Sequence, residues 1–203
     1  MRRTAVIFVL TILCLFSGGI LPEAGAQTKG KVPRLSVYSN LAYDLALVPN
    51  VGVQVGLGSG WALSARWDGS WWSKPGNYWR IYGPELTVRR YFPGKKHPGH
   101  HAGVYGQLLT YDFELRGGKG YLGGEPGGNL FDGANWGAGL EYGYTFRLTR
   151  RLHLDLSLGA GFFGGKYYTY EPLGGQYIWL TTERRNYIGP TRLEVSLYWN
   201  LVL

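Results

Sequence analysis

The feature that most constrains the fold of this chain is a strict alternation of apolar with polar or small residues in its carboxy-terminal half. Every second residue is apolar over residues 134–148, and glycines and polar residues fill the positions between them. After a short turn at 149–151 the pattern resumes over 152–162, and it returns over 192–203. A period of two is typical of β-strands whose two faces meet different surroundings. We therefore predict an antiparallel hairpin followed by a final strand.

The amino-terminal half shows the same alternation less regularly. Its pattern loses phase near Thr110, where we expect a β-bulge. The whole chain then holds about eight strands of about 9–11 residues, the length that a tilted strand needs to cross a bilayer. The strands expected in this half cover residues 35–44, 51–57, 61–71, 79–91 and 101–113.

The two faces of these strands favour one fold class, an all-β, antiparallel, up-and-down transmembrane β-barrel. Alternation alone is also compatible with a soluble β-sandwich, in which the apolar face would meet a second sheet. The polar face, however, carries charges of both signs, and tryptophans and tyrosines gather near the expected strand ends, as in an interfacial girdle. We therefore prefer the barrel.

The charged side chains of the polar face would all point into the barrel interior. Eight strands enclose a space that side chains fill, so a diffusion pore is not expected. Charges in so narrow a space must be paired, which predicts a lumenal ion-pair network rather than an ion pathway. Its expected members are Arg66, Asp68, Glu85, Arg89, Glu141, Arg147, Asp155, Arg192 and Glu194.

The first 26 residues have the pattern of a secretory signal peptide. Arg2 and Arg3 precede an apolar run over residues 5–16, and the small-residue triplet at 24–26 predicts cleavage before Gln27. The run is too short for a membrane-spanning helix. Residues 27–203 are then one domain, the barrel, in the outer membrane of a Gram-negative bacterium.

The net charge of +8 must be interpreted in that location. A basic excess often indicates nucleic-acid binding, but an exported chain meets lipid and lipopolysaccharide phosphates first, where basic residues act as anchors. We therefore expect outer-membrane lipid and lipopolysaccharide as partners, with a surface protein or glycan as a further partner and no nucleic acid. The oligomeric state is left open.

The connections between strands divide into two kinds. Short turns at 58–60, 93–99 and 149–151 fall on the side of the chain ends, and we assign them to the periplasm. The opposite, outward side receives the loops expected at residues 47–50, 73–77, 116–133 and 164–190.

The last of these loops is rich in aromatic and basic residues. Such a surface suits proteins, glycans or lipopolysaccharide cores, although the same aromatics could simply continue the interfacial girdle. The candidate surface-binding residues are Lys166, Tyr167, Tyr168, Tyr170, Tyr177, Trp179, Arg184 and Arg185.

Residue types that could support catalysis or metal binding are few. His97, His100 and His101 have no accompanying carboxylate or cysteine at a known site spacing, and we expect them in a solvated turn. His153 with Asp155 or Ser157 could form a dyad, but period two alone places such residues on one face. We expect no catalytic residue, no metal and no cofactor.

Several local strings resemble one known family. They occur at residues 40–50, 78–83, 99–106, 109–114, 139–144, 164–168 and 189–191. Together they resemble the Bacteroidales family of outer-membrane barrels catalogued as domain of unknown function 3575, over nearly all of the mature chain. The resemblance implies an outer-membrane protein without an established activity, and some members are encoded near fimbrial or OmpA-like components.

The sequence as a whole predicts a structural or surface-binding outer-membrane barrel. Its role would be to anchor or contact a surface appendage, a glycan or a protein. The alternative from another class is an outer-membrane lipid-modifying enzyme of the lipid A hydrolase or acyltransferase type.

Overall fold

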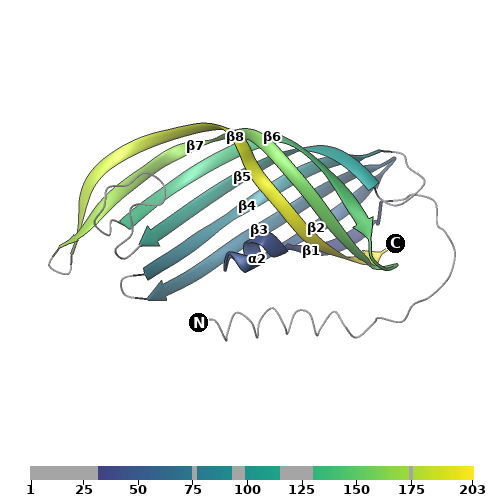
Figure 1. Ribbon diagram of the computed structural model, residues 1–203, viewed down its shortest axis with the longest axis horizontal. Coiled ribbons are helices and arrows are strands. Elements are labelled where there is room, and N and C mark those ends of the chain that lie inside the picture. Colours follow the sequence, from purple (N-terminus) through teal and green to yellow (C-terminus); the bar gives the residue numbers. More distant parts are fainter. Residues whose placement is uncertain (1–31, 75–76, 93–98, 115–129, 174–175) are drawn as a thin grey trace.

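The computed structural model describes residues 32–74, 77–92, 99–114, 130–173 and 176–203, which form eight strands and one short helix (Figure 1). In these described residues, no helix has both the length and the apolar character that crossing a membrane requires. The elements are β1 Leu35–Asn40, α2 Leu41–Leu45, β2 Asn50–Gly58, β3 Trp61–Lys74, β4 Asn77–Tyr91, β5 Gly99–Glu114, β6 Leu130–Arg147, β7 Leu152–Leu173 and β8 Gln176–Val202.

The eight strands form one closed antiparallel barrel with up-and-down connectivity, which confirms the predicted all-β, antiparallel, up-and-down barrel. Each strand pairs with its neighbour in the sequence, and β1 pairs with β8 to close the ring. The closing ladder runs from Leu35 opposite Val202 to Asn40 opposite Ser196, with a shift of register between Leu35 and Ser36. The chain therefore forms one closed sheet and not the two stacked sheets of a sandwich.

The barrel has apolar side chains outside and charged side chains inside, as the alternation predicted. On β8, Leu193 is 52% exposed, whereas the adjacent Glu194 is fully buried. On β3, Trp67 is 55% exposed between the buried Arg66 and Asp68. Soluble proteins bury their aliphatic residues and expose their charges. In this barrel the arrangement is reversed, since the aliphatic side chains are exposed and the charged side chains are buried.

Strand length is very unequal around the ring. β1 has six residues and β2 nine, whereas β7 has 22 and β8 has 27. The predicted outer loop at 164–190 is therefore wrong, because both strands continue and stay paired as far as Leu173 opposite Gln176. Aromatic and β-branched residues, which favour extended backbone, are frequent in this segment. We call residues 164–173 of β7 and 176–186 of β8 the outer hairpin. It extends past the other strands in Figure 1.

The strand predicted at 35–44 ends early, at Asn40, and helix α2 follows. The Asn40 side chain caps this helix by accepting a hydrogen bond from the Ala42 amide at 3.1 Å. The Asn50 side chain takes the next ladder position, since its Oδ1 accepts from the Asn40 amide at 2.6 Å and its Nδ2 donates to the Asn40 carbonyl at 3.0 Å. Side-chain groups thus replace backbone partners, and β1 stops pairing.

The predicted turn at 58–60 is confirmed by the structure. Gly58 and Gly60 have φ values of 86° and 81°, which a glycine adopts without strain, and Ser59 has φ 51°. The turn at 149–151 also lies where it was predicted, between β6 and β7.

Other predicted connections are described only in part. The turn at 93–99 and the loop at 116–133 fall mostly on residues outside the described ones, and the loop at 73–77 does so at residues 75 and 76. Where they are described, strand replaces loop, since β3 extends to Lys74 and β6 begins at Leu130.

The bulge predicted near Thr110 is wrong. The pairs Tyr82 with Thr110 and Glu85 with Gln107 share one register, so no residue is inserted there. The apparent loss of phase comes from Leu109, an apolar residue that lies half-buried on the inner face.

Candidate functional site

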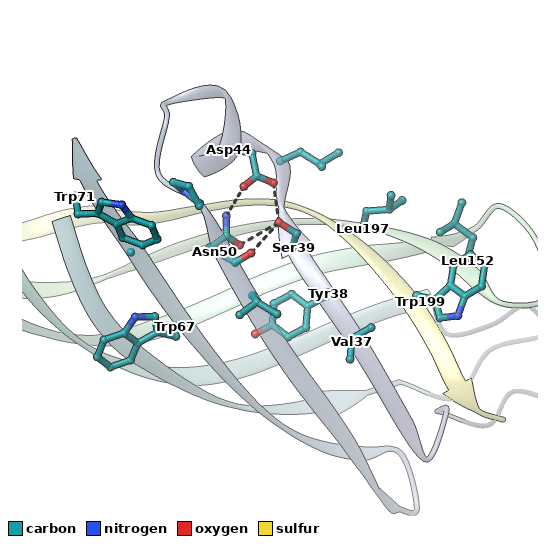
Figure 2. Close-up of a pocket in the computed structure, with 14 residues that line it drawn as sticks. Val37, Tyr38, Ser39, Asp44, Asn50, Trp67, Trp71, Leu152, Leu197 and Trp199 are labelled. Atoms are coloured by element: carbon teal, nitrogen blue, oxygen red, sulfur yellow. Dashed lines mark hydrogen bonds between the residues drawn. The ribbon is translucent and has the colours of Figure 1, made fainter. Parts of the chain in front are cut away.

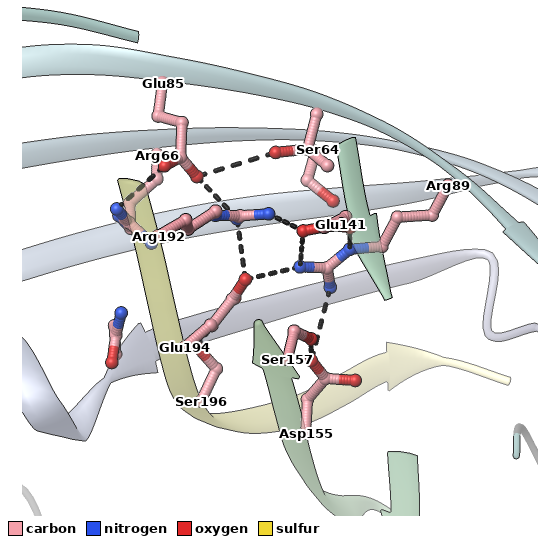
Figure 3. Close-up of polar contacts among 12 residues, drawn as sticks. Ser64, Arg66, Glu85, Arg89, Glu141, Asp155, Ser157, Arg192, Glu194 and Ser196 are labelled. Carbon is pink, nitrogen blue, oxygen red and sulfur yellow. Dashed lines mark hydrogen bonds and ion pairs between the residues drawn. The ribbon is translucent and has the colours of Figure 1, made fainter. Parts of the chain in front are cut away.

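A cluster of paired charges fills the middle of the barrel interior (Figure 3). Arg89 on β4 lies at its centre, with Nε 2.5 Å from Glu141 Oε1 and Nη2 2.5 Å from Glu194 Oε2. Its Nη1 donates a hydrogen bond to the Tyr198 hydroxyl at 2.6 Å. Glu141 also pairs with Arg192. One guanidinium thus joins side chains from β4, β6 and β8.

Two further arginines extend the cluster toward β3. Arg192 Nη2 lies 2.6 Å from both Glu194 Oε2 and Glu85 Oε1. Arg66 in turn places Nη2 3.1 Å from Glu85 Oε2 and Nε 2.8 Å from Asp68 Oδ1. Each arginine therefore bridges at least two carboxylates, which is the geometry that compensates the desolvation of a buried charge.

Eight of the nine predicted network residues belong to this cluster, and none of the eight is more than 4% exposed. Three arginines face five carboxylates, the fifth being Asp155, whose Oδ1 lies 3.8 Å from Arg89 Nη1. Hydroxyl groups supply the remaining donors, as where Ser196 donates to Glu194 at 2.7 Å. The cluster therefore occupies the interior as a polar core.

Arg147, the ninth predicted member, lies outside the network. It is the last residue of β6, its side chain is exposed, and its Nε donates to the Thr149 carbonyl at 3.2 Å. The alternation places Arg147 at an inward-facing position of the strand. At the rim of the barrel, however, an inward-facing side chain is not necessarily buried.

A histidine expected in a solvated turn is fully buried. His101 lies on the inner face of β5, with Nε2 2.8 Å from Asp155 Oδ2. Ser157 donates to Asp155 Oδ1 at 2.5 Å, and Thr145 donates to Asp155 as well. Because the Ser157 hydroxyl donates to the carboxylate and not to a histidine, the group is no nucleophile relay.

The sequence did hold a signal for this histidine, since His101 has the same parity as the buried Tyr105. His100 lies on the opposite, outer face, where the Tyr142 hydroxyl is 2.8 Å from its Nδ1. His97 falls outside the described residues. His153 is buried on the inner face beside Asn200, whereas Asp155 contacts His101. Asp155 therefore contacts His101 and Ser157. The dyad considered from the sequence, His153 with Asp155 or Ser157, is not among the described contacts.

The candidate surface-binding residues lie on two opposite faces of the outer hairpin. Lys166 and Arg184 are direct cross-strand partners on the outward face, and Tyr167 and Glu183 are partners on the inward face, where the tyrosine donates to the carboxylate. That carboxylate raises the pKa of Tyr167. Of the remaining candidates, strand parity places Tyr168, Tyr170 and Trp179 outward and Arg185 inward, and the side chain of Tyr177 lies outside the described ones.

A groove of about 410 Å³ opens on the outer wall beside α2 (Figure 2). It was not foreseen from sequence, because it depends on the early end of β1. Ser39 donates to Asp44 Oδ2 at 2.6 Å and Asn50 Nδ2 donates to Asp44 Oδ1 at 3.1 Å, so these polar groups satisfy one another. The apolar side chains that line it include Val37, Trp67, Trp71, Leu152, Leu197 and Trp199.

Fold and interior together define a class, the eight-stranded up-and-down β-barrels with a filled, charged interior. Within it, the chain belongs to DUF3575, a family of proteins of unknown function, whose pattern it matches over residues 7–201. The family resemblance expected from the sequence is thereby confirmed. No curated protein and no solved structure matches the chain. Across the described ranges, no three His, Cys, Asp or Glu side chains form a group that could hold a metal ion.

Proposed function

We propose that this protein is an integral β-barrel of the bacterial outer membrane with a structural and surface-binding role. Removal of residues 1–26 as a signal peptide and an origin among the Bacteroidales belong to the same proposal. Its partners would be outer-membrane lipid and lipopolysaccharide, together with a surface protein or glycan.

The observation that carries the proposal is a continuous apolar band on the outer wall. On β7 the outward residues from Leu152 to Phe162 are all apolar, and they span ten residues along the strand. At about 3.3 Å per residue and a tilt of about 40°, this stretch covers about 25 Å, the height of the apolar band of membrane barrels. The closed ring of hydrogen bonds is the other property that hydrocarbon surroundings require.

Aromatic residues at both ends of this band support the same placement. At one end Trp136 packs against Phe162, with ring centroids 4.8 Å apart. At the other end the Arg90 guanidinium lies 5.4 Å from the centre of the Trp61 ring. Tryptophan and arginine are favoured where hydrocarbon gives way to headgroups.

The filled interior supports a structural role rather than a transport role. The Arg89 cluster occupies the space through which a solute would pass, and Tyr38 and Tyr198 stack beside it at a centroid distance of 4.4 Å. Opening a path would separate buried ion pairs, which costs about 3–5 kcal/mol for each charge left without its partner.

The lipid-modifying enzyme is kept as the alternative, but no described contact favours it. Its most plausible nucleophile, Ser157, is engaged with Asp155 in the interior, away from the lipid that such an enzyme would process. We therefore propose a protein without catalytic activity. Deleting the gene should leave the host's lipid A profile unchanged, and a changed profile that His101→Ala or Ser157→Ala reproduces would favour the enzyme.

Membrane fractionation and gel mobility test the proposal directly. The protein should be found in the outer-membrane fraction, and in detergent it should migrate differently before and after boiling, because a closed barrel has no edge from which to unravel. Planar bilayers containing it should show no large steady conductance. Recovery in the periplasm would contradict the membrane placement, and a porin-sized current would contradict the filled interior.

A further inference from the structure

Two cations face each other on the outward side of the outer hairpin, and no described side chain serves as their counter-ion. Lys166 on β7 is the direct cross-strand partner of Arg184 on β8, and both side chains are exposed. Neither forms an ion pair with any other described residue. Like charges directly opposite each other destabilise a sheet. An anion lying between the two cations would offset this repulsion.

The described acidic residues nearby, Glu183 and Asp132, do not fulfil that role. Glu183 points to the other face of the hairpin, where it accepts the hydroxyl of Tyr167. Asp132 on β6 is exposed on the same side but lies opposite Tyr168 in the ladder, and it forms no ion pair with either cation. The site therefore keeps a net positive charge.

A cleft of about 500 Å³ lies at these cations, and we call it the cationic cleft. Its charged end holds Lys166 and Arg184, with the Tyr168 hydroxyl and the Asn186 amide as further hydrogen-bonding groups. Its other end is apolar and is formed by the packed rings of Trp136 and Phe162. The residues that line the cleft are Ala134, Trp136, Phe162, Gly165, Lys166, Tyr168, Arg184 and Asn186.

The height of the cleft on the barrel matches a membrane surface. Lys166 is four residues beyond Phe162, the last member of the apolar band on β7. At the same rise and tilt this places the Lys166 backbone about 10 Å outside the hydrocarbon, at the level of lipid headgroups. Below the cations, the neighbouring strand β8 presents Ile188, which is 82% exposed and continues the apolar path toward the bilayer.

We infer that the cationic cleft binds a phosphorylated lipid of the surrounding leaflet. The phosphate lies between Lys166 and Arg184, since a guanidinium can donate two parallel hydrogen bonds to phosphate oxygens. The acyl chains lie along Phe162, Trp136 and Ile188. This inference rests on the proposed membrane placement and adds to it a ligand class and a position on the barrel.

The test is native mass spectrometry of the detergent-solubilised full chain titrated with diphosphoryl lipid A. Wild-type protein should retain the lipid, and its dephosphorylated form should be retained far less. Removing one cation, in Lys166→Ala or Arg184→Ala, should weaken retention about fivefold, and removing both about 25-fold, for a gain of about 1 kcal/mol per basic residue at an anionic surface. Arg185→Ala is the matched control, because it removes an equal charge from the inward face of the same strand.

Further arms separate the sources of the anion. Inorganic phosphate at millimolar concentration should not displace the lipid, because it lacks the apolar contacts. Displacement by phosphate alone, equal retention of dephosphorylated lipid, or an equal loss in Arg185→Ala would each overturn the inference. Gel mobility before boiling shows whether each variant still forms the barrel. A wild-type chain that does not insert into phosphatidylcholine vesicles would instead contradict the membrane placement itself.

Discussion

Replacing Arg89 with methionine should lower the free energy of unfolding by about 3–5 kcal/mol, the usual cost of leaving buried partners without their counter-charge. Two carboxylates, of Glu141 and Glu194, lie 2.5 Å from this guanidinium, and a third, of Asp155, lies 3.8 Å from it. Methionine fills similar volume but supplies no charge and no donor. The loss is therefore electrostatic and not a loss of packing.

The adjacent residue provides the control. Arg90 follows Arg89 in the chain but faces outward, over the Trp61 ring at 5.4 Å. Arg90→Met removes the same charge from the same strand and should cost less than about 1 kcal/mol, the value of a partly solvated cation–π contact. Both values can be measured by urea titration of protein refolded into phosphatidylcholine vesicles, followed by tryptophan fluorescence.

A double-mutant cycle shows whether the loss comes from the cluster. Glu194→Gln alone should also destabilise, but Arg89→Met with Glu194→Gln should cost less than the sum of the single changes, by about 0.5–3 kcal/mol. Equal costs for Arg89→Met and Arg90→Met, or additive effects in the cycle, would refute the argument that paired charges form the core of the barrel.

Three further outcomes are expected. Leu156→Arg should destabilise the barrel in vesicles by about 2–4 kcal/mol, because this exposed side chain lies on the outer wall near the middle of the apolar band, which the proposed placement sets against lipid. Leu156→Phe should have little effect in the same titration, and tolerance of the arginine would contradict the outward facing. In thermal melts, Gly143→Ala should cost about 1–3 kcal/mol by overpacking, since a Cβ there would overlap Ser157 Oγ. Gly106→Ala, with its nearest contact at 3.9 Å, should be neutral or slightly stabilising in the same thermal melts. Amino-terminal sequencing of the exported protein should begin at Gln27, and a start before residue 21 would contradict the signal peptide.

The interior of the barrel could be predicted from sequence because the facing of a strand residue is a local property. Parity along each strand placed Glu85, Arg89, Glu141 and Glu194 on one side, and closure of the ring brought them together. No residue spacing in the sequence says which arginine meets which carboxylate. That pairing depends on the register between strands, which the closed ring fixes.

The predictions that failed depended on where strands end. Arg147 has inward parity yet is exposed, because β6 stops there. β1 ends at Asn40, whose backbone amide donates to the Asn50 side chain and whose own side chain accepts from the Ala42 amide. This is a local capping pattern within a segment that otherwise alternates like a strand. The cationic cleft was missed as a unit for the same reason, since Lys166 and Arg184 meet only if their segment is a paired hairpin and not a loop.

Closure by the shortest strand has a consequence for how the barrel forms. The ladder between β1 and β8 joins Ser36 to Asn200, which are 164 residues apart. Every other ladder joins two strands that follow each other directly along the chain. Such a pairing carries the largest loop-closure entropy of the fold, so it should be the last ladder to form and the first to open. Six residues of β1 must hold it, helped by the Ser36 hydroxyl, which donates to Asn200 Oδ1 at 2.7 Å, and by Asn40 Nδ2, which donates to the Leu193 carbonyl at 3.1 Å. The kinetic lifetime of the whole barrel is then set at this one junction, by a strand with less than a quarter of the length of its partner.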